Sequence, residues 1–168
     1  MRPDVIAAGG LIAIALFALW AKRRFANVFS AGTREGSVIA YDIPKVIKQL
    51  QESANDGNFV VFIFIPPNTT DGEAVNLQYS IEDGAVGFDW VLISPRNVAD
   101  QTKMKEFAST LGCPLKECEM NNTRYLRATG DGISDLGKSI IKDFYKVDLN
   151  SKLDIVTEGF VWPPQRAP

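Results

Sequence analysis

A long uncharged segment near the start of the chain constrains its fold more than any other feature. Residues 5–21 read VIAAGGLIAIALFALWA, and as a helix they extend over about 25 Å, close to the thickness of a bilayer core. Trp20 closes the segment, and three basic residues follow at once, as is typical of a membrane interface. These basic residues are Lys22, Arg23 and Arg24. We therefore predict a single transmembrane helix within a membrane anchor at residues 1–24.

Two alternatives leave this segment outside a bilayer. A cleaved signal peptide is also short and apolar, but no A-x-A pattern follows the segment before the basic residues. A core helix is normally amphipathic, whereas this segment has no polar face. Three basic residues follow the span and only Arg2 precedes it. The positive-inside rule therefore predicts a single-pass, signal-anchor protein in the membrane, with its C-terminal domain in the cytosol and the lipid bilayer as one partner.

The rest of the chain has the length and composition of one globular domain. Apolar residues make up 46% of the 168 residues and charged residues 23%, which allows one hydrophobic core and argues against disorder. Residues 25–37 contain two glycines and show no clear period, as is typical of a linker. We predict a juxtamembrane linker at residues 25–37, an α/β domain at 38–162 and a proline-rich tail at 163–168.

The spacing of apolar residues predicts eight elements in this domain. Residues 59–65, FVVFIFI, are uniformly apolar and indicate a central strand buried on both faces. Apolar and polar residues alternate from Val75 to Glu82, which predicts a strand with one face in water, and Asp83-Gly84 then predicts a hairpin turn. The other expected elements are a helix between Asp42 and Asn55, a strand at 86–94, a helix at 100–111, a strand at 124–128, a helix at 133–147 and a strand at 153–157. The order α-β-β-β-α-β-α-β predicts a mixed β-sheet with helices on both faces.

The absence of histidine restricts the chemistry open to the chain. Histidine is the commonest general base and the commonest metal ligand in proteins, and the sequence has none. Its two cysteines, Cys113 and Cys118, are too few for a disulfide framework or a zinc site. A net charge of -2 gives no general attraction to nucleic acid. We therefore predict no catalytic residue, no metal, no cofactor and no nucleic-acid partner, and we do not favour an enzyme.

One segment matches a phosphate-binding pattern. Residues 132–139, GISDLGKS, fit G-x-x-x-x-G-K-[ST], follow an expected strand and enter an expected helix. The alternative is a capped amphipathic helix, because Ile133 and Leu136 belong to its apolar stripe and should already be helical where a loop would wrap phosphate. The candidate phosphate-binding residues are Gly132, Gly137, Lys138 and Ser139.

The element order α-β-β-β-α-β also resembles the core of metal-dependent nucleases of the restriction-endonuclease type. In that family, the third strand carries an acidic residue and a lysine two positions apart. Here Asp83 ends one strand and Asp89 lies on the next, but Val91 stands where the resemblance requires the lysine. Without a cation to stabilise the developing phosphate charge, the resemblance does not predict a nuclease. We therefore interpret Asp83 as a turn residue and Asp89 as a residue of a polar face.

The strong anchor and the missing active site together favour a binding function. We predict a membrane-tethered cytosolic domain that acts as a protein-protein interaction or scaffold module in a membrane assembly, with a protein partner. The alternative prediction is a phosphate- or nucleotide-binding enzyme. It would use Lys138 and Ser139 on phosphate and an acidic group such as Asp131 at a metal.

Overall fold

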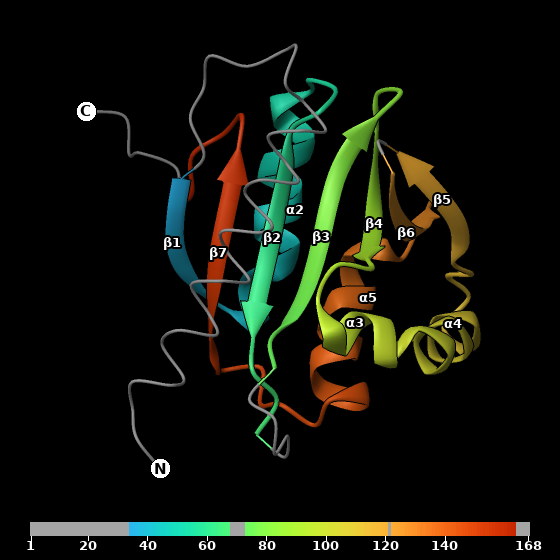
Figure 1. Ribbon diagram of the computed structural model, residues 1–168. Coiled ribbons are helices and arrows are strands. Elements are labelled where there is room, and N and C mark those ends of the chain that lie inside the picture. Colours follow the sequence, from blue (N-terminus) through green and yellow to red (C-terminus); the bar gives the residue numbers. More distant parts are fainter. Residues whose placement is uncertain (1–33, 68–72, 121, 164–168) are drawn as a thin grey trace.

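The computed structural model describes residues 34–67, 73–120 and 122–163 of the chain. Within these ranges the chain forms seven strands and four α-helices (Figure 1). The strands are β1 (Arg34–Ile39), β2 (Phe59–Phe64), β3 (Val75–Glu82), β4 (Ala85–Val91), β5 (Lys116–Met120), β6 (Thr123–Thr129) and β7 (Lys152–Glu158). The helical elements are the 3-10 turn η1 (Ala40–Asp42), the α-helices α2 (Ile43–Ser53), α3 (Pro95–Ala99), α4 (Gln101–Thr110) and α5 (Ile133–Ser139), and the π-helical turn η2 (Ile140–Phe144).

All seven strands belong to one antiparallel sheet. Their order is β1-β7-β2-β3-β4-β6-β5, and every neighbouring pair is antiparallel. The prediction of a mixed sheet is therefore wrong. A helix that joined the predicted strands at 86–94 and 124–128 directly would make them parallel neighbours. Instead, the unpredicted strand β5 reverses the chain first, so β6 returns antiparallel to β4.

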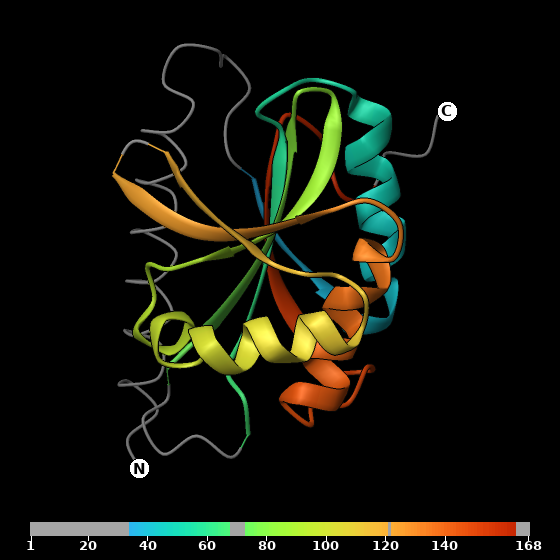
Figure 2. The ribbon, with the colours of Figure 1, turned by 90° about the vertical axis from the view of Figure 1, so that its right-hand side faces the viewer.

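The helices α2, α4 and α5 pack on one face of the sheet, which we call the first face. Figure 2 shows α2 and α5 along this face. The α2 residues that it buries follow the spacing i, i+3, i+4 and i+7, as an amphipathic helix requires. They are Ile43, Val46, Ile47 and Leu50. Opposite them, the sheet contributes Phe62, Tyr79, Phe88 and Trp90, all fully buried. Burying each such side chain contributes roughly 1.5–3 kcal/mol, so this core is the main source of stability.

The predicted membrane anchor finds no support in the structure. The described part of the chain contains no helix that is long and apolar enough to cross a membrane. The predicted span at residues 5–21 lies outside the described residues, as do Trp20 and the three basic residues after it. The predicted fold class was a membrane anchor followed by a mixed sheet with helices on both faces. We correct it to an α/β domain built on an antiparallel sheet. The membrane and signal-anchor interpretation is dropped with it.

Most of the other predicted elements are confirmed within a few residues. The predicted strands at 59–65 and 153–157 are β2 and β7, and the predicted helix at 100–111 is α4. Asp83 and Gly84 form the turn between β3 and β4, and both have the positive φ that a tight hairpin turn uses. Three elements were missed, namely β1, which begins inside the predicted linker, the short helix α3 and the edge strand β5.

Candidate binding site

The second face of the sheet, opposite α2 and α5, carries an apolar cluster of its own. Its buried members come from β2, β4, β6, β7 and the residue before β3, and none belongs to a described helix. Side chains of β5 and of the segment after β4 pack against them. We call the buried members the second-face cluster: Phe59, Val61, Ile63, Ala74, Val91, Tyr125 and Val156. The second face is therefore rich in large apolar side chains.

A buried ion pair between β4 and β6 also lies on this face. Asp89 Oδ1 accepts a hydrogen bond from an Arg127 guanidinium nitrogen at 2.5 Å, and the side chains are 0% and 9% exposed. The sheet register places the two residues opposite each other on β4 and β6. Asp89 Oδ2 accepts from Ser80 Oγ at 2.5 Å and from Gln78 Nε2 at 3.2 Å. The polar face of β3 is thus buried in a hydrogen-bonded network, and the prediction that it faces water is wrong.

Gly87 makes room for the Arg127 side chain. A Cβ atom at position 87 would lie 2.3 Å from Arg127 Cζ, far closer than two carbon atoms approach each other. The guanidinium therefore lies directly over the Gly87 backbone. Its other nitrogens reach the carbonyl oxygen of Ser80 at 3.3 Å and the Glu82 carboxylate at 3.4 Å. These contacts fix the position of the Arg127 side chain within the network.

Asn97 in α3 ties the ends of β3 and β4 together. Its Nδ2 donates to the carbonyl oxygens of Asn76 at 2.9 Å and Val91 at 3.0 Å, and its Oδ1 accepts from the Asn76 amide at 3.2 Å. Trp90 Nε1 donates to the Asn97 carbonyl oxygen at 2.9 Å. The helix begins at a Ser94 cap, whose Oγ accepts from the Asn97 amide at 3.1 Å. These bonds fix α3 rigidly at the end of the sheet.

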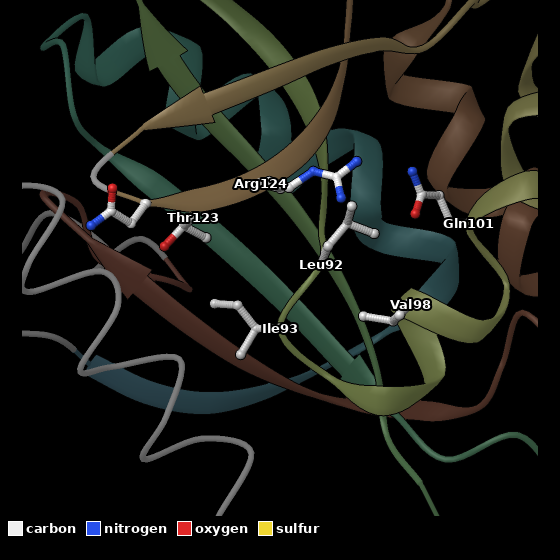
Figure 3. Close-up of a pocket in the computed structure, with 7 residues that line it drawn as sticks. Leu92, Ile93, Val98, Gln101, Thr123 and Arg124 are labelled. Atoms are coloured by element: carbon white, nitrogen blue, oxygen red, sulfur yellow. The ribbon is translucent and has the colours of Figure 1, made fainter.

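A groove opens beside α3, at the border of the second face. It has a volume of about 410 Å³ and is lined by the segment after β4, by α3, by the start of α4 and by the β5–β6 turn. Figure 3 shows the polar ends of Arg124 and Gln101 pointing toward each other across it. Val98 is 51% exposed, while Ile93 is half-buried and also packs on the second-face cluster. The lining residues are Leu92, Ile93, Val98, Gln101, Asn122, Thr123 and Arg124.

The cationic rim of this groove is joined to a neighbouring carboxylate. The Arg124 guanidinium lies 3.6 Å from Glu117, and Lys105 lies 2.5 Å from the same carboxylate. The hydrogen bond and charge of Lys105, with a smaller effect of Arg124, lower the pKa of Glu117. Arg124 itself is 59% exposed. Two cations thus share the Glu117 carboxylate, and Glu119 lies opposite Arg124 in the sheet register, while the Arg124 guanidinium stays largely open to solvent.

The segment that matched the phosphate-binding pattern is helical. Gly132 is the N-cap of α5, with φ +88°, and the other three candidates, Gly137, Lys138 and Ser139, lie in the helix itself. The amide of Leu136 already donates to the Gly132 carbonyl oxygen at 3.1 Å, so it is engaged in the helix rather than aimed at an anion. Lys138 pairs with Asp135 at 2.8 Å.

Gly137 is needed for packing. A Cβ atom there would lie 2.5 Å from Tyr79 Oη, which donates to the Ile133 carbonyl oxygen at 2.9 Å. Burial raises the pKa of Tyr79, so its hydroxyl stays protonated as that donor. The structure therefore brings the four motif residues together as an amphipathic helix on the first face, which was the alternative interpretation of the segment.

The remaining candidates occupy scattered positions. Asp131 is exposed in the turn before α5, and Asp83 lies in the β3–β4 turn. Val91, at the position where a nuclease would have lysine, belongs to the second-face cluster. Cys113 is buried, which raises the pKa of its thiol, and Cys118 is half-buried on β5, both as free thiols. The described residues contain no group of three acidic or cysteine side chains close enough to hold a metal ion.

The sequence contained signals for part of the missed site. Ser94-Pro95 is a typical helix start, a capping residue followed by proline in the first turn, and it predicts α3 and hence the wall of the groove. Asp89, between the large residues Phe88 and Trp90, is a charge within an apolar strand and indicates a buried polar contact. The identity of its partner, Arg127, follows only from the strand register.

Comparisons with known proteins identify no relative. No family model matches the sequence, and no curated protein or solved structure matches it. The function is therefore inferred from the geometry of the chain itself.

Proposed function

We propose that this chain is a protein-interaction domain whose groove beside α3 binds a short segment of another protein. The segment would present an aliphatic side chain next to an acidic group. The observation that carries this proposal is the groove of about 410 Å³, which combines an exposed valine with an exposed arginine. Binding sites for small ligands and peptides typically combine such an apolar floor with a few placed polar groups.

The apolar part of the groove favours an aliphatic side chain. Val98 is half exposed, although it lies on a helix held by the buried bonds of Asn97. Leu92 and Ile93 continue this apolar surface toward the sheet. Covering Val98 removes apolar area from water, at about 25 cal/mol per Å², and the rigid helix loses little entropy on binding.

The charge of the rim favours an acidic group beside that aliphatic side chain. The Arg124 guanidinium is 59% exposed and lies 3.6 Å from Glu117, so a carboxylate of the bound segment can still reach it. Guanidinium groups bind carboxylates through two parallel hydrogen bonds, which adds geometric specificity. Gln101, which faces Arg124, offers a further amide donor (Figure 3). We place the aliphatic side chain over Val98 and the acidic group at Arg124.

Peptide selection on the full-length chain tests this proposal. Phage-displayed random peptides should yield sequences with an aliphatic residue followed closely by Asp or Glu. Val98→Asp should abolish their binding, because it puts a carboxylate where the aliphatic side chain would sit and repels the acidic group. Arg124→Glu should do the same through charge alone.

A matched control separates this effect from a general loss of structure. Leu111, at the end of α4, is 44% exposed, and Leu111→Asp should keep the selected peptides bound. Circular dichroism should show the same melting curve for all three variants. If the selected peptides bind Val98→Asp as tightly as the unchanged protein, the groove is not their binding site.

A further inference from the structure

The end of the sheet where β7 starts carries most of the exposed large apolar side chains. In the part of the chain that the structure describes, five such side chains are exposed. Three of them lie at this end, namely Ile39 at 39%, Tyr41 at 61% and Ile65 at 38%, and the other two are Val98 and Leu111. The ends of β1 and β2 flank the start of β7 there (Figure 1). Single exposed apolar residues are ordinary, whereas a group of them marks a contact with another molecule.

The backbone places these three side chains around the start of β7. Ile39 is the register partner of Lys152, the first residue of β7. Ile65 and Lys152 line the same pocket, which has a volume of about 490 Å³. The Tyr41 amide donates to the Leu149 carbonyl oxygen at 2.8 Å, which holds Tyr41 beside the segment that enters β7. The exposed apolar side chains therefore surround a pocket with a lysine at its border.

The charges that line this pocket are balanced and exposed. They belong to two lysines, Lys146 and Lys152, and two aspartates, Asp148 and Asp154. None of the four forms an ion pair with another described residue. A strongly acidic or strongly basic partner would place like charges against half of them, whereas a second copy of this surface offers both signs equally. We call this surface the end surface: Ile39, Tyr41, Ile65, Lys152 and Asp154.

We propose that the end surface is the interface of a two-fold symmetric homodimer, so its occupant is a second copy of this chain. Lys152 and Asp154 lie two residues apart on β7 and point to the same face, because side chains alternate along a strand. A two-fold axis between them lays the two β7 strands antiparallel. Lys152 of each copy then faces Asp154 of the other, so one contact forms two ion pairs. Ile39 and Ile65 lie on either side of these pairs and lose apolar area to water when the copies meet.

Exchange of the two charges tests this interface in the full-length chain. Sedimentation velocity over a series of concentrations should show the unchanged protein passing from monomer to dimer. Lys152→Asp should lose the dimer, because each copy then brings two carboxylates to the axis. Asp154→Lys should lose it as well, because each copy then brings two ammonium groups. An equimolar mixture of these two variants should recover a dimer, since an acidic surface then meets a basic one.

A matched control separates the interface from a general effect of charge. Lys103 on α4 is exposed and lies outside the end surface, so Lys103→Asp should keep the dimer. Val98→Asp should also keep it, so peptide binding in the groove and dimer formation can fail independently. A monomer at every concentration, a dimer that persists in either single variant, or a mixture that stays monomeric would overturn the proposal.

Discussion

At the scale of single residues, the second face depends on Asp89 and Arg127. Removing both charges from water is costly, and the direct bond between them offsets this cost only while both partners are present. Ser80 and Gln78 occupy the second carboxylate oxygen, so the network is arranged around Asp89.

The first prediction concerns this pair. Asp89→Ala should lower the free energy of unfolding by about 3–5 kcal/mol, because it removes the nearest carboxylate of the buried Arg127 guanidinium and leaves only Glu82, at 3.4 Å. The double variant Asp89→Leu with Arg127→Met should be markedly more stable than the single one. Urea unfolding at pH 7 measures both. Glu52→Ala, which breaks the exposed pair with Lys48, should change stability by less than about 1 kcal/mol.

The second prediction concerns Gly137. Gly137→Ala should cost about 1–3 kcal/mol, because the new methyl group overlaps Tyr79 Oη. In the double variant with Tyr79→Phe the cost should be less than the sum of the single changes, since the overlapping oxygen is gone. Urea unfolding of the four proteins measures this coupling.

The same motif also tests the alternative function. Lys138→Ala should leave the binding of inorganic phosphate and of nucleotides at background, as in the unchanged protein, because Lys138 lies in a helix paired with Asp135. Isothermal titration measures this binding. Nucleotide binding that disappears in Lys138→Ala, at an unchanged melting temperature, would instead favour the phosphate-binding enzyme.

At the scale of elements, α3 is short but firmly attached. Asn97 satisfies main-chain groups of β3 and β4 that would otherwise be buried without partners. Asn97→Ala should therefore cost at least about 2 kcal/mol, since several buried hydrogen bonds of about 1 kcal/mol each are lost together. The midpoint of urea unfolding checks this value. Val98→Ala is the matched control, and its half-exposed side chain should make its effect much smaller.

The contact between α4 and β5 is the basis of a pH prediction. Lys105 holds the pKa of Glu117 below its ordinary value, so this pair stabilises the folded chain above the unfolded pKa of about 4.3. The contribution is lost as the pH falls through the folded pKa. Lys105→Met should therefore raise the pKa of Glu117 in an NMR titration, and Lys103→Met should not. A Glu117 titration that Lys105→Met leaves unchanged would contradict this contact.

At the scale of the whole molecule, the sequence predicted the local elements far better than their arrangement. The apolar run at 59–65 and the alternation from Val75 to Glu82 have the periods of strands, and both strands are present. Periodicity does not report which strands pair. β1 and β5 lie at the edges with few buried side chains, and without them the topology could not be inferred.

The candidate site was harder to predict than the fold. Gln78 and Ser80 have the pattern of a water-facing strand surface, yet they are buried, because their surroundings are set by residues distant in the sequence. The groove combines residues from β4 to β6, and only the Ser94-Pro95 helix start marked it in advance. The GISDLGKS segment matches a phosphate-binding pattern locally, but its residues form the helix α5 and its N-cap.

The position of β7 has a consequence for synthesis. Because this last strand fits between the first two, a growing polypeptide carries β1 and β2 with a missing neighbour between them until Glu158 has been made. Unpaired strand borders of this kind attract other chains. A premature stop before Lys152 would therefore yield a product in which β2 is an open edge and β1 has no strand to pair with, so synthesis of β7 protects the nascent protein from aggregation.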